Sequence, residues 1–145
     1  MLQRGEIDYL VLHYEWVRDE IETQWLGEEV NVLVEKNHYK GPDVYLDHDE
    51  KDQTTSRYFK SKKDKRKISR RYLDDVYGLL DGVKLGLGRA IIPTHLIRGE
   101  SNLKILDSKT TLNYPIVLHY YRQPFYTKLH STLVETLVSE CPKFL

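Results

Sequence analysis

Short apolar runs along this chain alternate with longer stretches in which apolar residues recur every three or four positions. Runs of three to six apolar or β-branched residues, bounded by polar or turn-forming residues, are typical of buried strands. The sequence predicts strands at Ile7–Leu12, Val30–Val34, Val44–Leu46, Ile68–Arg71, Ala90–Ile92, Leu103–Leu106 and Ile116–Tyr120.

Three segments have the signals of helices. Thr54, Thr55 and Ser56 offer N-caps for a helix that runs to about Lys62. A second helix is predicted from Tyr72 to Leu85, on the helical spacing of Leu73, Val76, Tyr77, Leu80 and Val83.

Glycine and proline mark where the second helix and the next strand end. Gly86 and Gly88 let the chain leave the helix and enter a buried strand within about three residues, and Pro93 ends that strand. A third helix is predicted from about Thr127, with its apolar stripe and Phe125 in the core. The stripe consists of Leu129, Leu133, Val134, Leu137 and Val138.

The alternation of strands and helices predicts an α/β fold with mainly parallel sheets. With 145 residues, the chain fits one ordinary domain or two small lobes. Lysine and arginine number 22, as do aspartate and glutamate, so no net field favours nucleic acid or an anionic membrane. One cysteine, no signal-peptide run and no apolar membrane span predict a cytoplasmic protein.

Three segments in order resemble the effector domain of LysR-type transcription regulators. Leu2–Val11 (LQRGEIDYLV) looks like the family's helix-to-strand junction L-x-x-G-E-[IL]-D. Gly82–Pro93 (GVKLGLGRAIIP) resembles the most specific stretch, V-x-x-G-x-G-[IL]-[AT]-x-[IL]-P. Tyr114–Tyr121 (YPIVLHYY), with the terminal amphipathic helix after it, is similar to the closing strand and helix.

This resemblance implies a fold like that of type 2 periplasmic binding proteins. Two lobes would be joined by two crossing strands, with a small effector bound between the lobes. Residues 1–34 and 114–145 would form the first lobe, and residues 35–113 the second. The chain starts at the end of the first lobe's second helix, so that lobe is expected to be incomplete. The winged helix that binds DNA would lie outside this chain.

Ligands of open α/β sheets bind outside the carboxyl ends of the strands. His13 and Tyr14 follow the first strand, where His13 would attract a carboxylate or be an ordinary surface residue. Asp52, Thr54 and Thr55 follow the Val44–Leu46 strand. The free amides and hydroxyls there would hold an anion, cap the helix, or do both.

A third strand end leads from Ile68–Arg71 into Tyr72. Arg70 or Arg71 would pair with a carboxylate of the effector, or would simply belong to a solvated basic run. Eight of the twelve residues from Lys60 to Arg71 are lysine or arginine. We interpret that run as a solvated surface in preference to a phosphate-binding patch, because no aromatic residues interleave it.

Neither catalysis nor a metal or cofactor site is predicted. Serine, histidine and aspartate are scattered without a nucleophile elbow. The acidic run Asp47–Asp52 lacks the glycine and closing glutamate of a calcium loop, and one histidine makes a poor zinc site. His119 lies in an apolar strand and is expected to be a core residue.

The predicted function is therefore effector sensing in a LysR-type regulator, by a domain that is not an enzyme. The effector is expected to be small and anionic, on the evidence of Arg70, Arg71 and His13. The family implies a homodimer, and DNA contact only through the winged helix. The alternatives are a solute-binding protein for transport and an enzyme on the same two-lobe scaffold.

Overall fold

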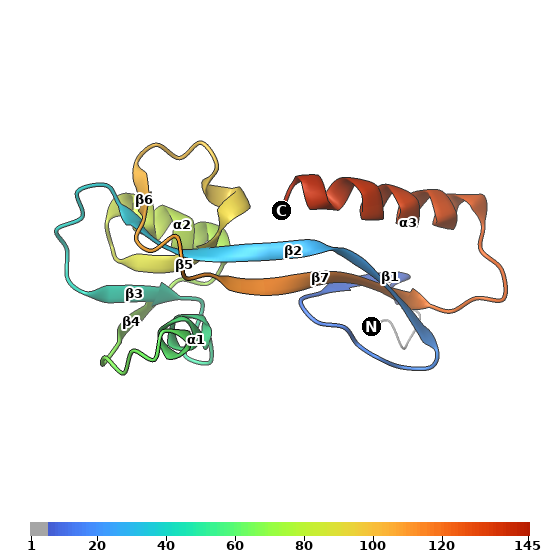
Figure 1. Ribbon diagram of the computed structural model, residues 1–145, viewed down its shortest axis with the longest axis horizontal. Helices are drawn as coiled ribbons and strands as arrows, with labels where there is room; N and C mark the ends of the chain where they lie inside the picture. The colour runs from blue at the N-terminus through green and yellow to red at the C-terminus, as the bar shows by residue number, and fades with distance from the viewer. Residues whose placement is uncertain (1–5) are drawn as a thin grey trace. The chain divides into compact units, whose positions relative to one another are not determined.

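We analysed the fold in a computed structural model, which describes residues 6–145. Residues 2–5 of the first family-like segment, Leu2–Val11, lie outside the described part. The strands and helices follow one another in the order predicted from the sequence (Figure 1). The chain divides into two compact units: unit 1 comprises Met1–Glu29 and Asn113–Leu145, and unit 2 comprises Val30–Leu112.

Unit 1 contains three strand segments and the C-terminal helix. Strand β1 (Tyr9–Leu12) pairs antiparallel with β7 (Leu112–Tyr121), and β7 also neighbours β2 (Ile21–Lys36). Helix α3 (Lys128–Glu140) is followed by a short 3-10 helix, Cys141–Lys143. Val134 and Leu137 of α3 pack on a core of Leu26, Ile116, Leu118 and Tyr120.

Unit 2 contains a five-stranded portion of sheet with a helix on each face. The C-terminal part of β2 pairs antiparallel with β5 (Arg89–Pro93) and with β6 (Leu103–Ile105). Strand β3 (Val44–Asp47) runs parallel to both β5 and β4 (Ser69–Tyr72). The helices are α1 (Thr54–Ser61) and α2 (Val76–Leu85), and a 3-10 helix at Thr94–Ile97 follows β5.

The strands of unit 2 are apolar on both sides because both faces are covered. In β3, Val44 and Leu46 join a core under α2, whereas Tyr45 joins a second core under α1. The same alternation holds in β5, where Ala90 and Ile92 join the core under α2 and Ile91 joins the core under α1. These short continuous apolar runs were therefore correctly predicted as buried strands.

The α/β fold class is confirmed, but the sheet is mixed and not mainly parallel. Within residues 6–145, β3 runs parallel to β4 and β5, whereas β1 with β7, and β2 with β5 and β6, are antiparallel. Strand β2 is also far longer than the predicted Val30–Val34, since it begins at Ile21. Its first part includes Glu22, Thr23 and Gln24, whose partly exposed polar side chains hide the strand from an apolar pattern.

Two helix starts differ from the prediction. Helix α2 begins at Val76 and not at Tyr72, because Tyr72 still belongs to β4 and the side chain of Asp75 caps the helix by accepting from Gly78 N. Helix α1 has Gln53 at its N-cap position, with no side-chain cap, so Thr54, Thr55 and Ser56 are inside the helix and are not its caps.

The side chains expected in the core of unit 1 were only partly predicted correctly. His119 is confirmed as a buried, hydrogen-bonded core residue: Trp16 N donates to its Nε2 at 2.9 Å, and its Nδ1 lies 3.3 Å from the Leu10 carbonyl oxygen. Phe125 and Leu129 were expected in the core, but each is 80% exposed. Phe125 lies before α3 and Leu129 lies in its first turn. The α3 residues that face the core are Val134 and Leu137.

The predicted glycine turn is confirmed, and glycine is needed at its two positions for different physical reasons. Gly86 has a φ of 76°, which is the left-handed conformation that ends α2. Gly88 is buried, and a Cβ added there would lie 2.9 Å from the carbonyl oxygen of Val44 and 2.9 Å from Leu46 Cδ2. The close approach of β5 to β3 therefore requires a residue without a side chain.

We predict that Gly88→Ala lowers the free energy of unfolding by about 1–3 kcal/mol, because a neighbouring strand must move to admit the methyl group. The matched control is Gly78→Ala, whose Cβ would meet atoms no closer than 3.6 Å in the first turn of α2. That variant should be neutral, or stabilising by about 0.4–1 kcal/mol. Urea denaturation measures the free energy of unfolding of both variants. Equal effects would contradict the steric requirement for glycine at position 88.

Candidate functional site

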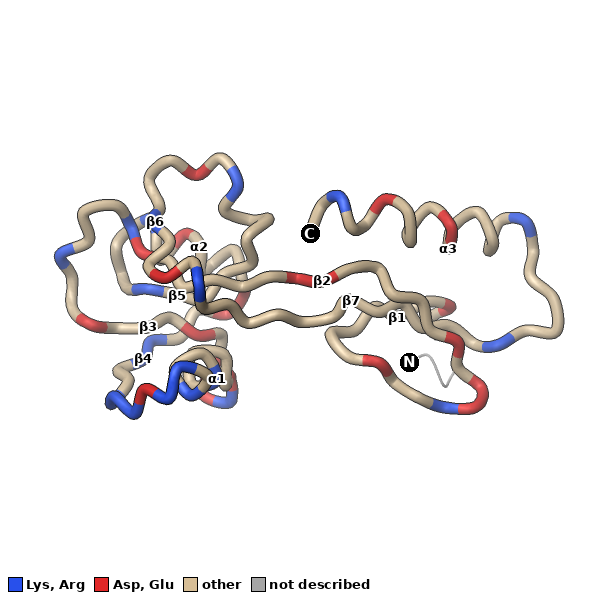
Figure 2. The backbone as a smooth tube through the Cα atoms, in the orientation of Figure 1, with Lys and Arg blue, Asp and Glu red and all other residues tan. Residues whose placement is uncertain are grey.

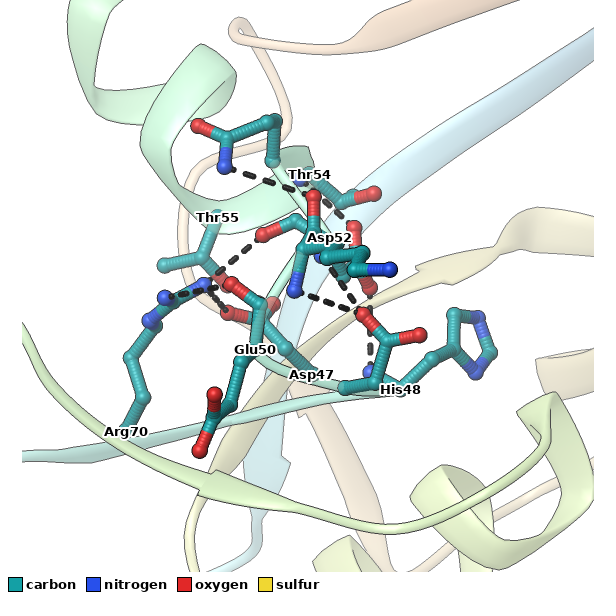
Figure 3. Close-up of polar contacts among 10 residues, drawn as sticks. Asp47, His48, Glu50, Asp52, Thr54, Thr55 and Arg70 are labelled. Carbon is teal, nitrogen blue, oxygen red and sulfur yellow. Dashed lines mark hydrogen bonds and ion pairs between the residues drawn. The ribbon is translucent and has the colours of Figure 1, made fainter.

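A buried carboxylate lies where β3 ends. Asp47 is only 1% exposed, and its two oxygens have different partners. The hydroxyl of Thr55 donates to Oδ1 at 2.5 Å, and an Nη atom of Arg70 donates to Oδ2 at 3.0 Å (Figure 3). A buried carboxylate is costly unless a cation and hydrogen-bond donors meet it. These two partners satisfy that requirement from α1 and β4.

Arg70 also fixes the loop that connects β3 to α1. The nitrogen that meets Asp47 donates to the carbonyl oxygen of Asp52 at 2.7 Å, and the other Nη donates to that of Glu50 at 3.2 Å (Figure 3). The guanidinium carbon lies 5.4 Å from the centre of the Tyr72 ring, within the range of a cation–π contact. The side chain of Arg70 is therefore largely committed inside the protein.

Carboxylates within the loop hold its backbone. Asp52 accepts from His48 N at 3.0 Å and from Thr54 N at 2.8 Å, and Asp49 accepts from Lys51 N and Asp52 N. Burial alone would raise the pKa of Asp52, but hydrogen bonds from Thr54 and His48 favour the charged form, so its pKa lies below the usual value. The loop thus enters α1 in a defined geometry.

The start of α1 is suited to an anionic group. The first amides of a helix have no partner within the helix, and the helix dipole is positive at that end. Thr54 N is already bound by Asp52, and α1 has no acidic residue in its first turn. The amides of Thr55 and Ser56, with the partly exposed Thr54 side chain beside them, supply hydrogen-bond donors at this position.

The structure brings together four of the sequence-predicted site residues: Asp52, Thr54, Thr55 and Arg70 (Figure 3). They differ in accessibility, because Thr55 is completely buried and its hydroxyl is donated to Asp47. Tyr72 is 42% exposed beside Arg70.

The remaining predicted site residues lie apart from this cluster. Arg71 does not join it, since its guanidinium donates to the carbonyl oxygen of Leu87, after α2. His13 and Tyr14 belong to unit 1, immediately after β1, and both are exposed. The His13 ring stacks on Tyr114, with 6.0 Å between ring centres and 24° between ring planes.

Asp47 is the residue whose role the sequence analysis missed. It was grouped with the acidic loop residues as a weak metal candidate, whereas it is a structural anion at the strand end. The sequence signal that could have revealed this ion pair was an aspartate directly after one predicted buried strand and arginines at the end of another. Among residues 6–145, no group of three or more histidine, cysteine, aspartate or glutamate side chains is placed to hold a metal ion.

The chain has the fold of the regulatory domains of LysR-type regulators. Full-length LysG from Corynebacterium glutamicum, solved with its effector Arg, matches with a TM-score of 0.80 at 16% identity, over 99% of this chain and 54% of that one. The bromide-bound regulatory domain of HypT from Salmonella typhimurium matches with 0.75 at 16% identity, over 99% of this chain and 76% of that one.

A third similar structure is the CcmR regulatory domain from Synechocystis PCC6803 in complex with 2-PG. Its TM-score is 0.73 at 13% identity, over 95% of this chain and 75% of that one. The match to full-length LysG spans about half of that protein's length. No protein-family model matches the chain, and no curated protein matches it significantly. None of the helices in residues 6–145 is long and apolar enough to cross a membrane.

We predict that Arg70→Met lowers the free energy of unfolding by roughly 2–3 kcal/mol, because it leaves the Asp47 carboxylate buried without its cation. Adding Asp47→Asn should restore part of that loss, giving a coupling energy of about 1 kcal/mol or more in a double-mutant cycle. The neighbouring Arg71→Met is the control, with an expected loss of about 0.5–1 kcal/mol. If the losses in free energy of unfolding at positions 47 and 70 are additive, the proposed pairing is wrong.

Proposed function

We propose that this chain is the effector-sensing regulatory domain of a LysR-type transcription regulator, which binds a small metabolite and thereby controls transcription. The observation that carries the proposal is the match of 99% of the chain, at a TM-score of 0.80, to LysG with its bound effector. The glycine turn before Pro93, which resembles that family's most specific stretch, supports it independently. Unit 1 would be the first lobe and unit 2 the second.

The carboxyl end of β3 and the start of α1 form the second-lobe part of the proposed effector site. There, we assign the amides of Thr55 and Ser56 to the ligand, together with the Thr54 hydroxyl, which also interacts with the Asp52 carboxylate. Arg70 is assigned a positioning role, because its guanidinium already binds Asp47 and two loop carbonyls. His13 and Tyr14, exposed after β1, remain candidates on the first lobe.

An anionic effector fits these groups best. Helix amides and a threonine hydroxyl donate hydrogen bonds, and Asp47 is not available to a cation because it is buried and paired. Bromide, bound by the HypT regulatory domain, is an anion, and Arg, the effector of LysG, carries a carboxylate. Because Arg is a net cation at neutral pH, these relatives support an anionic group on the ligand and not its net charge or identity.

Control of transcription requires that the effector bind one arrangement of the regulator better than another. In the whole protein, which we propose to be a cytoplasmic homodimer, operator DNA would be bound by a winged helix outside this chain. The similar solved structures are regulators, which favours regulation over solute transport and over catalysis. A shift of the two-state population is then the whole mechanism, and no chemical step is needed.

We predict that a thermal-shift screen will find a small carboxylate or other anion that raises the melting temperature, because a ligand of the native state stabilises it. Thr54→Val should then weaken binding about five- to tenfold by calorimetry, since it removes one hydroxyl donor. Thr132→Val, on the exposed side of α3, is the control and should bind like the parent chain. Binding of cations alone would contradict the assigned site.

Regulation and transport can be separated with a chimera. The part of LysG that this chain matches is replaced by this chain, and a LysG-dependent promoter drives a reporter. We expect the ligand from the thermal-shift screen to change reporter output, and Thr54→Val to shift the response to higher ligand concentration. A chimera that binds the ligand and its promoter but never responds would favour solute binding over regulation.

A further inference from the structure

A recess opens on unit 2 beside α1, lined by Ser56 near the start of the helix and by Phe59 and Lys60 in its last turn. It has a volume of about 340 Å³ and lies between the last turn of α1 and the segment leading to β4. Phe59 and Ile68 provide apolar surface inside it, while Lys60, Lys63 and Lys65 lie along its rim. The recess therefore combines an apolar floor with a border of positive charge.

The positive charge around this recess is not neutralised by the protein. Of the eight cations from Lys60 to Arg71, three have carboxylate partners: Lys62 with Asp107, Arg66 with Asp64 and Arg70 with Asp47. The side-chain ammonium groups of four exposed lysines have no hydrogen bond or ion pair with any residue from 6 to 145. These lysines are Lys60, Lys63, Lys65 and Lys67. Figure 2 shows the basic positions gathered along α1 and the segment after it.

The one acidic residue on the rim is already committed. Asp64 accepts from Arg66 Nε at 2.8 Å, and this hydrogen bond holds the pKa of Asp64 below its usual value. The guanidinium carbon of Arg66 lies 4.8 Å from the centre of the Phe59 ring and so covers part of the apolar floor. Asp64 thus balances Arg66 and leaves the rim lysines unopposed.

One rim lysine occupies a backbone position that normally favours glycine. Lys63 has a φ of 55°; its N–H donates to Lys60 O, and Asp64 N donates to Phe59 O, which completes a Schellman motif at the end of α1. Helix α2 ends in the same motif, with Gly86 at the equivalent position. A lysine there costs conformational free energy that glycine would avoid. The protein accepts this cost at Lys63, whose side chain lines the recess.

We propose that this recess, which we name the lysine recess after Lys60, Lys63 and Lys65, is a docking site for an acidic protein segment that carries one large apolar side chain. The apolar side chain would enter between Phe59 and Ile68, and flanking aspartate or glutamate would pair with the lysines. The lysines around the apolar pocket complement the charge of such a segment, and this docking role does not depend on the proposed effector function.

A protein segment fits this surface better than a nucleic acid does. Phosphates would meet the lysines, but bases need exposed aromatic faces for stacking, and Phe59 is only 4% exposed, with Tyr45, Tyr58 and Arg66 against its ring. The recess is at the lower limit of small-molecule pockets, which hold about 300–1,000 Å³. Its size suits a single side chain whose backbone continues over a charged rim.

The test is fluorescence anisotropy on the whole chain with labelled octapeptides. One peptide has aspartate and glutamate flanking a central leucine–phenylalanine pair; the second has alanine in place of that pair. We expect the first peptide to bind at least tenfold more tightly, and to weaken as salt rises. A 20-base-pair DNA duplex is the competitor. If the duplex binds more tightly than the first peptide, or the alanine peptide binds equally well, the proposal is wrong.

Two sets of variants locate the site. Lys60→Glu, Lys63→Glu and Lys65→Glu together should weaken binding of the first peptide at least tenfold. The matched triple Lys104→Glu, Lys109→Glu and Lys128→Glu, at exposed positions outside the basic run, should weaken it less than threefold. Equal losses in the two triple variants would mean that only net charge matters, which overturns the proposal.

Lys63→Gly separates docking from folding. Because glycine accepts the left-handed conformation, this variant should melt at a higher temperature than the parent chain. It should nevertheless bind the peptide several-fold less tightly, because the rim loses a charge. Unchanged peptide affinity in this stabilised variant would show that Lys63 serves no docking role and would remove the reason given for its strained backbone.

Discussion

The candidate site depends on the charge of one buried aspartate. Asp47 ends β3 almost without exposure to water, so its carboxylate must be met by a cation and a donor within the protein. Thr55 and Arg70 meet it from α1 and β4, and Arg70 continues to the loop carbonyls of Glu50 and Asp52. One ionic requirement therefore joins two strands, a loop and a helix start into a single hydrogen-bonded assembly.

That assembly fixes the geometry of the start of α1 through contacts within the protein itself. The loop does not have to fold around an anion, because Asp52 and Asp49 already hold its amides. Preorganised donors lose little entropy on binding, which favours affinity. The same helix carries positive character at both ends, as oriented amides at its start and as unpaired lysines at its end. We propose different partners for the two surfaces, a small anion at one and an acidic segment at the other.

Much of the fold was predictable because hydrophobic pattern is local information. The buried runs around Leu33, Tyr45 and Ile91 identified strands, since a sheet covered on both faces needs apolar residues at consecutive positions. The first half of β2 was missed because Glu22, Thr23 and Gln24, which are polar and partly exposed, interrupt its apolar pattern. Leu129 was misplaced for a related reason: its helical spacing is correct, but the tertiary packing of α3 leaves it exposed.

The sequence alone determined the order of strands and helices, the α/β class and the glycine that ends α2. Tertiary structure decided which neighbouring residues act together. Arg70 and Arg71 are adjacent and chemically identical, yet only Arg70 reaches Asp47, while Arg71 contacts the carbonyl of Leu87. The parallel register of β4 beside β3 sets that choice. Periodicity is fixed by near neighbours, whereas ion pairing depends on segments 23 residues apart being brought side by side.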